Sequence, residues 1–147
     1  MSEPAATSAS SLPEFRNIEL ASLLTYRWPL ASMASGMHRI AGAFLFILMP
    51  FIVWMFDTSV SSEISFLKFK AAFTVGLLGL PGFVWTLVAL GLVWAGLHHG
   101  LAGLRHLWMD AHHAQITKDF GRRSAAGVIA LTLCLTAVLG AKLFGLY

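Results

Sequence analysis

Three long uncharged runs restrict this fold more than any other feature of the sequence. They cover residues 40–56, 71–104 and 124–141, and contain no Asp, Glu, Lys or Arg. A helix needs roughly 20 predominantly apolar residues to cross a bilayer, so each run can cross once. Hydrophobic residues make up 57% of the 147-residue chain and charged residues 12%, against about 25% charged in soluble proteins. We therefore expect an all-α integral membrane protein with three transmembrane helices.

Proline and glycine set the expected ends of these helices. Pro29 suits a first helical turn and Ser32 an N-cap, so the first helix should begin there. Pro50 lies inside this helix and can kink it, as membrane helices tolerate. Residues 57–70 and 110–123 are polar enough to connect the spans. The predicted spans are residues 30–56, 83–107 and 124–143, within a transmembrane domain of residues 14–147.

The first 13 residues differ in composition from the rest. Residues 1–13 are rich in Ser, Ala and Pro, with one acid and no basic residue. They predict a disordered N-terminal tail. A secretory signal starts with positive charge before an apolar core, and a mitochondrial presequence is rich in arginine. Neither pattern is present, which favours a bacterial inner membrane over a mitochondrial one.

The basic residues predict the orientation. Three crossings place the N-terminal flank and the second loop on one side. That side carries Arg16, Arg27, Arg39, Arg105, Lys118, Arg122 and Arg123, and the other carries Lys68, Lys70 and Lys142. The positive-inside rule then places the N-terminus in the cytoplasm. Because these residues flank helices, they also explain the net charge of +3, and no nucleic-acid partner is expected.

Cysteine chemistry within the chain is excluded. Cys134 is the sole cysteine and lies inside the third apolar run. Disulfides within the chain, zinc sites built on cysteine pairs and covalent haem attachment at Cys-x-x-Cys-His all need more cysteines than this.

A stripe of glycine and histidine marks the second span. Gly96, His99, Gly103 and His106 follow one another at spacings of three, four and three, so they share a helix face. Glycines beside an imidazole leave room for a flat macrocycle whose iron lies in line with the ring nitrogen. The alternative is that small residues only let neighbouring helices pack closely. A histidine inside a span is costly and usually functional, which favours the ligand interpretation.

If His99 is an axial haem ligand, the second ligand is not obvious in this chain. His98 points about 100° away from His99 and is expected to make a structural hydrogen bond. His106 lies two turns along on the same side of the helix, so it cannot bind the opposite face of one iron. His38 is expected too close to the membrane boundary to match His99. The sequence thus predicts a partner chain, unless the iron is not bis-histidine.

A second group of polar residues begins the first span. Ser35 and Arg39 are one helical turn apart on one face, with His38 beside them. A hydroxyl and a guanidinium there can bind a quinone carbonyl or a carboxylate such as a haem propionate. Alternatively, Arg39 only extends to the phosphate layer. Arg105 and Asp110 are expected at the same depth, where Asp110 can also pair with Arg105 or His106.

These two groups of residues resemble a known family. Ser35, His38, Arg39 and Gly42 match the Ser-x-x-His-Arg-x-x-Gly signature of the succinate dehydrogenase cytochrome b556 subunit. The segment from His99 through Gly103, Arg105 and His106 to Asp110 is similar to the family's second signature, and both occur in the family's order. The resemblance covers residues 14–147, apart from the divergent connection 57–70.

The resemblance implies a function and a set of partners. It implies that His99 is an axial iron ligand of a haem b shared with a second hydrophobic anchor subunit, which supplies the opposing histidine. Ser35 and Arg39 match the ubiquinone pocket, and His38, Arg39 and His106 lie in the haem propionate region. The other partners are an iron–sulfur subunit and a flavoprotein that oxidises succinate; this chain carries no motif for flavin or iron–sulfur clusters.

Two other functions remain open at this stage. One is a haem-free structural anchor, in which the histidines only pack and form hydrogen bonds. The other is a small transporter or channel subunit that uses His99 and Arg39 in a polar pathway.

Overall fold

The computed structural model describes residues 19–147, so the tail predicted for residues 1–13 lies outside the described residues. The described chain is almost entirely helical. The elements in order are α1 (Leu20–Thr25), α2 (Leu30–Ile47), α3 (Met49–Val60), α4 (Glu63–Thr74), β1 (Gly76–Leu77), β2 (Leu80–Pro81), α5 (Gly82–Ala111), the 3₁₀ turn η1 (His113–Gln115) and α6 (Lys118–Leu143).

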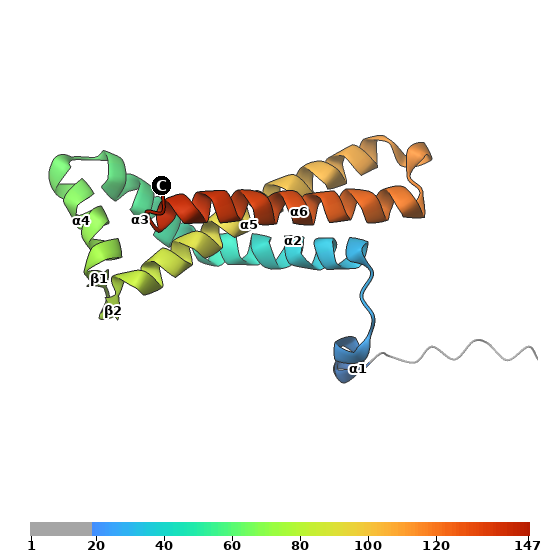
Figure 1. Ribbon diagram of the computed structural model, residues 1–147, viewed down its shortest axis with the longest axis horizontal. Coiled ribbons are helices and arrows are strands. Elements are labelled where there is room, and N and C mark those ends of the chain that lie inside the picture. The colour runs from blue at the N-terminus through green and yellow to red at the C-terminus, as the bar shows by residue number, and fades with distance from the viewer. Residues whose placement is uncertain (1–18) are drawn as a thin grey trace, which may run out of the picture.

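Three long helices form the body of the molecule. Helices α2, α5 and α6 lie side by side, and each is long and apolar enough to cross a membrane. The start of α2, the end of α5 and the start of α6 share one end, whereas α3, α4 and the β-hairpin lie at the other (Figure 1). We call these the site end and the hairpin end. The predicted all-α membrane protein with three transmembrane helices is confirmed.

Small residues make the contacts among the three long helices. The buried apolar residues of these helices are all alanines, namely Ala34, Ala41, Ala89, Ala95, Ala102 and Ala125. Large apolar side chains instead cover the outside of the bundle, as Phe46 at 79% exposure and Leu107 at 68% illustrate. Lipid tails are as apolar as leucine, so membrane helices associate through close backbone approach. The exposed apolar surface is what lipid or a partner helix requires.

The predicted first span is not one continuous helix. Helix α2 ends at Ile47, Leu48 caps it, and α3 begins at Met49. Pro50 lies in the first turn of α3, where its missing N–H costs nothing. Inside a continuous helix, the same proline would lose a hydrogen bond and its ring would clash with the carbonyl of Phe46. The expected kink is therefore a break two residues earlier, and α3 leaves the line of α2 (Figure 1).

The expected polar connections are more helical than predicted. Helix α3 continues to Val60, and α4 begins at Glu63 after a reciprocal capping box between Ser62 and Ser65. At the site end, α5 extends to Ala111 and Thr117 caps the start of α6. The expected N-cap at Ser32 is wrong, because α2 begins at Leu30 directly after Pro29 and Ser32 lies inside the helix.

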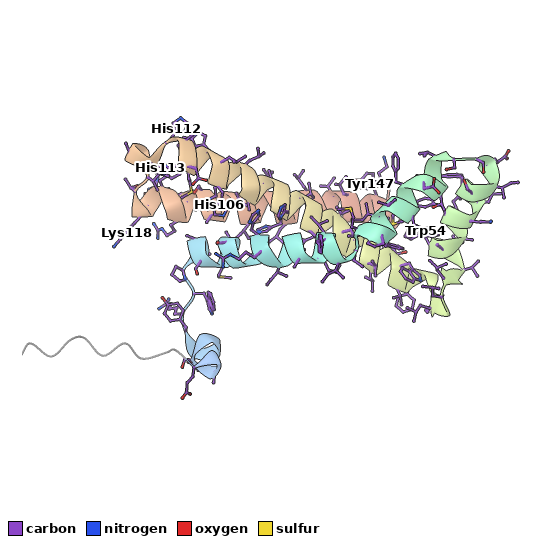
Figure 2. All side chains as sticks on the ribbon, turned by 180° about the vertical axis from the view of Figure 1, so that it is seen from behind. Trp54, His106, His112, His113, Lys118 and Tyr147 are labelled. Carbon is purple, nitrogen blue, oxygen red and sulfur yellow. The ribbon has the colours of Figure 1, made fainter. Side chains whose placement is uncertain are left out.

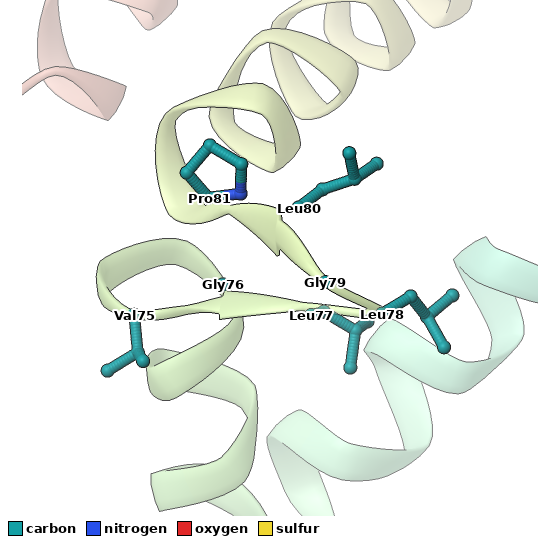
Figure 3. A pocket seen from close by; sticks show the side chains of 7 residues that line it. All are labelled: Val75, Gly76, Leu77, Leu78, Gly79, Leu80 and Pro81. Carbon is teal, nitrogen blue, oxygen red and sulfur yellow. The ribbon is translucent and has the colours of Figure 1, made fainter.

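A short hairpin joins α4 to α5. Gly76 and Leu77 pair with Pro81 and Leu80 across a two-residue turn, which Figure 3 shows at close range. The turn residues Leu78 and Gly79 both have positive φ, at 52° and 77°, as a tight hairpin turn that follows strand twist requires. Trp85 of α5 donates its indole N–H to the Leu77 carbonyl at 3.0 Å. This bond fixes the hairpin against the start of α5.

Candidate cofactor site

Two parallel stripes of residues run along α5. The inner stripe consists of Ala95, His98, Ala102 and Arg105, and the outer stripe consists of Gly96, His99, Gly103 and His106. Each stripe follows the three, four, three spacing of one helix face, and the two faces differ by one residue, or about 100°. The first three residues of the inner stripe are buried, whereas every residue of the outer stripe is partly or fully exposed.

His98 on the inner stripe is fully buried and uses both ring nitrogens. Its Nε2 lies 3.3 Å from the Ala34 carbonyl of α2, and its Nδ1 lies 3.4 Å from Thr132 Oγ1 of α6. A carbonyl only accepts, so Nε2 carries the proton and donates, while Nδ1 accepts from the threonine hydroxyl. The predicted structural hydrogen bond of His98 is confirmed. Of the adjacent residues His98 and His99, His98 therefore has no ring nitrogen left to bind another group.

His99 on the outer stripe has the opposite arrangement. Its Nδ1 lies 3.2 Å from the His38 carbonyl of α2, so Nδ1 carries the proton and Nε2 keeps its lone pair. This is how metal-ligating histidines are commonly oriented, with the second ring nitrogen donating to a backbone carbonyl. The ring lies so close to α2 that a Cβ on Gly42 would be 2.9 Å from His99 Cε1. Gly42 therefore makes room for the imidazole.

His38 joins the outer stripe from α2. Its ring stacks on His99 with centroids 4.2 Å apart and planes 14° apart, and its centroid lies 5.3 Å from that of His106. Figure 2 places His106 in the body of the bundle near α2. The predicted mismatch in depth between His38 and His99 is wrong, because α5 extends beyond the start of α2 and the two rings stack on each other.

The stacking still excludes one arrangement of the two rings. Two axial imidazoles point their nitrogens at a common iron from opposite sides. In this structure, the planes of His38 and His99 lie face to face instead. The Nε2 atom of His38 is buried without a hydrogen-bond partner among the described residues. A buried polar nitrogen normally has a partner, so this atom indicates a polar group that the chain does not provide.

Ser35 and Arg39 lie one turn apart on α2, next to this cluster. Ser35 is half-buried and Arg39 exposed. Within residues 19–147, neither side chain makes a hydrogen bond or ion pair. The hydroxyl and the guanidinium are both available to an outside group.

Arg105 does not belong to this cluster. Its Nε donates to Ser124 Oγ at 2.9 Å and its guanidinium to the Gly121 carbonyl at 3.1 Å, both on α6. Asp110 is exposed and accepts no bond from Arg105. The possible pairing of Asp110 with Arg105 is therefore not formed, since Arg105 lies on the inner stripe and faces α6. No pattern in the sequence indicates Ser124 or Thr132 as partners, because the rotation of α6 relative to α5 does not follow from residue spacing within one helix.

Other histidines are remote from the cluster. His112 and His113 are exposed and bond to the carbonyls of Trp108 and Met109 in the last turn of α5. Figure 2 shows both residues just beyond the end of α5. In the described part of the chain, no three His, Cys, Asp or Glu side chains are grouped to hold a metal ion.

Fold and site together define a small membrane-embedded three-helix subunit that presents an oriented imidazole on a glycine-lined face. Residues 16–139 match the succinate dehydrogenase/fumarate reductase transmembrane subunit family. The chain is also 31% identical over 116 residues to the succinate dehydrogenase cytochrome b556 subunit of Paracoccus denitrificans, covering 79% of this chain and 83% of that protein. The chain belongs to this family of transmembrane subunits.

Proposed function

We propose that this chain is the haem b-bearing membrane anchor of a succinate:ubiquinone oxidoreductase. The observation that carries the proposal is the opposite hydrogen bonding of adjacent histidines: His98 uses both nitrogens, whereas His99 keeps Nε2 available. A haem b bound there supplies a one-electron carrier within the membrane. The relative named above carries cytochrome b556 in its name, which supports haem as the occupant.

The residues around His99 fit this group. Gly42 keeps bulk away from the His99 imidazole, and Gly103 leaves room beside the His38 ring. The positions facing Gly96 and Gly100 are open, with no atom within 4 Å of an added Cβ. The buried Nε2 of His38 lacks a partner among the described residues. A haem propionate can accept a hydrogen bond from it, with Arg39 and His106 as further donors.

The opposing iron ligand comes from a second hydrophobic anchor subunit in this proposal. His38 stacks on His99, and His106 lies two turns along the same stripe, so neither reaches the opposite face of an iron bound to His99. The largely apolar outer surface of the bundle suits a membrane partner. An iron–sulfur subunit and a flavoprotein complete the complex, since this chain carries no motif for succinate oxidation.

The quinone site is assigned to Ser35 and Arg39. Reduction of ubiquinone to ubiquinol takes up two electrons, which come from succinate through the soluble subunits, and two protons. The Arg39 guanidinium donates to a quinone carbonyl oxygen and stabilises the negative charge that develops there, while the Ser35 hydroxyl orients the ring. Both groups are available because no described residue bonds them.

The membrane orientation follows from the same arrangement. The site end gathers Arg27, Lys118, Arg122 and Arg123, while the hairpin end has Lys68, Lys70 and Lys142. The positive-inside rule places the site end and the N-terminus in the cytoplasm of a bacterial cell, with the chain in its inner membrane. Protons for ubiquinol then come from the cytoplasmic side.

Haem binding is tested with the purified complex. We expect a reduced-minus-oxidised spectrum with a b-type band that His99→Ala abolishes. His112→Ala is the matched control and should keep the band, since that histidine is exposed and its ring bonds to Trp108 at the end of α5. A complex without the band, or a band unchanged by His99→Ala, would refute the haem assignment and favour a haem-free anchor.

Quinone reduction is tested through Arg39→Ala. We expect ubiquinone turnover to fall about 100-fold or more, as for removal of a donor that stabilises developing charge, while succinate oxidation by an artificial dye persists. Arg122→Ala is the control, because Arg122 is exposed and pairs only with Asp119. Normal ubiquinone turnover in Arg39→Ala would refute the quinone assignment. Solute flux without a co-purifying flavoprotein would favour the transporter alternative.

A further inference from the structure

We infer that His98 is a positioning residue that holds all three transmembrane helices in register around the proposed site. It lies on α5, its Nε2–H donates to Ala34 on α2, and its Nδ1 accepts from Thr132 on α6. His98 and Thr132 are 0% and 1% exposed. Among the described residues, His98 is the residue whose side-chain hydrogen bonds connect all three helices α2, α5 and α6.

Leaving the two hydrogen bonds of His98 unmade would destabilise the bundle. A buried imidazole in a membrane bundle has no water to satisfy its nitrogens. Both nitrogens of His98 are satisfied only when α2 and α6 are in this register, because each partner comes from a different helix. A helix that slides or rotates by one residue would leave a buried polar nitrogen without a partner. The Trp94 ring, stacked on His98 with centroids 5.7 Å apart, limits rotation of the imidazole.

The residues that these hydrogen bonds join lie next to the residues of the proposed site. Ala34 precedes Ser35 in α2, and His98 precedes His99 in α5. The bond from His98 to the Ala34 carbonyl and the bond from His99 to the His38 carbonyl lie one turn apart on α2. Two bonds at adjacent turns fix both the separation and the rotation of α2 relative to α5. They therefore set where Ser35 and Arg39 lie relative to the His99 imidazole.

Helix α6 contributes no side chain to the histidine cluster. The hydroxyl of Thr132 bonds to His98, the residue next to His99, so it links α6 to the helix segment that carries the site. This part of the inference rests on the proposed function, since it names what His98 positions.

Thr132 provides the test, because a valine has nearly the same shape without the hydroxyl. Thr136 is one turn further along α6, and its buried hydroxyl has no hydrogen-bond partner within the described chain. Thr132→Val and Thr136→Val therefore remove the same group from neighbouring turns, and only the first breaks a bond to His98. Thr132→Ser keeps the hydroxyl and should restore whatever Thr132→Val loses.

The measurements use the whole complex. We expect Thr132→Val to lower the thermal midpoint more than Thr136→Val, to shift the haem band or its midpoint potential, and to raise the ubiquinone KM about two- to tenfold, as for loss of one hydrogen bond. Thr132→Ser should behave as wild type. His98→Gln, whose amide can donate to Ala34 and accept from Thr132, should retain more haem than His98→Leu.

Two outcomes would overturn the inference. Equal thermal midpoints for Thr132→Val and Thr136→Val would show that the bond to His98 does not hold the helices. A lower midpoint with unchanged band, potential and KM would show that His98 stabilises the fold without positioning the site. A wild-type complex without haem or quinone turnover refutes the proposed function, and the thermal comparison then still decides whether His98 joins the helices.

Discussion

The inner and outer stripes of α5 are one residue apart and have opposite properties. On the inner stripe, His98 and Arg105 each bond to neighbouring helices through their side chains. On the outer stripe, His99 is held by one nitrogen only, and Gly96 and Gly103 present no side chain. The adjacent histidines His98 and His99 thus have different roles, because they lie on two different faces of one helix. The inner stripe satisfies its polar groups within the chain, and the outer stripe leaves polar groups for an outside partner.

The strongest test of this contrast is to remove the ligand and add it back. We expect His99→Gly to lose the b-type haem band almost completely, because both nitrogens of the neighbouring His98 are engaged and cannot replace it. Imidazole in solution should restore the band in part, since the glycine leaves a space of the right shape. Spectra with and without imidazole measure this. A band that persists in His99→Gly without imidazole would mean that another histidine binds the iron.

Removing a polar side chain from the inner stripe should lower the stability of the complex and leave its haem content unchanged. Arg105→Ala removes charged hydrogen bonds to Ser124 and Gly121, which should cost about 1.5–3 kcal/mol each at most. Thermal unfolding of the purified complex measures the loss. Arg122→Ala is the control, because its exposed ion pair with Asp119 should contribute about 0–1 kcal/mol. Loss of haem from Arg105→Ala at an unchanged thermal midpoint would place Arg105 in the cofactor site.

A methyl group on α2 should disturb the outer stripe without breaking the bundle. In Gly42→Ala the new Cβ would lie 2.9 Å from His99 Cε1, so the imidazole must shift away from the His38 carbonyl at a cost of about 1–3 kcal/mol. Haem content per complex should fall. In Gly103→Ala the new Cβ would be 3.6 Å from His38 Nε2, an ordinary contact, so the haem content should fall less. Equal haem contents in the two variants would contradict the close fit of His99 against Gly42.

The smallest effect is expected at the open end of the outer stripe. Gly96→Ala meets no atom of this chain within 4 Å, and alanine favours a helix over glycine by at most about 1 kcal/mol. The amount of folded subunit should therefore be unchanged. The haem band should shift slightly, because the methyl group faces the side on which the cofactor is proposed. An unchanged band would remove Gly96 from that surface.

The sequence predicted the three helices and the outer stripe of α5 well. Apolar runs and helical periodicity are local properties, so Gly96, His99 and Gly103 could be placed on one face without any knowledge of their neighbours. The prediction that His98 makes a structural bond was also correct, since it required only the angle between adjacent residues. Whether His99, Ser35 and Arg39 bind haem and quinone stays a prediction.

Relations between helices could not be predicted in the same way. The depth of His38 relative to His99 depends on how far α5 extends beyond the start of α2, and the partners of Arg105 depend on the rotation of α6. Neither quantity is encoded in the spacing of residues within one helix. The kink predicted at Pro50 differs from the observed break at Leu48 for a local reason, since Pro50 lies in the first turn of a new helix and not within a continuous one.

The break at Leu48 also determines how the molecule fits a bilayer. At 1.5 Å per residue, α2 is about 27 Å long, whereas α5 is about 45 Å and α6 about 39 Å. A hydrocarbon core of about 30 Å matches α2 and is too thin for the other two helices. The excess length of α5 and α6 must tilt or project into the headgroup layer. Any excess length that projects at the site end would carry the last turns of α5, including the exposed Asp110, out of the hydrocarbon core.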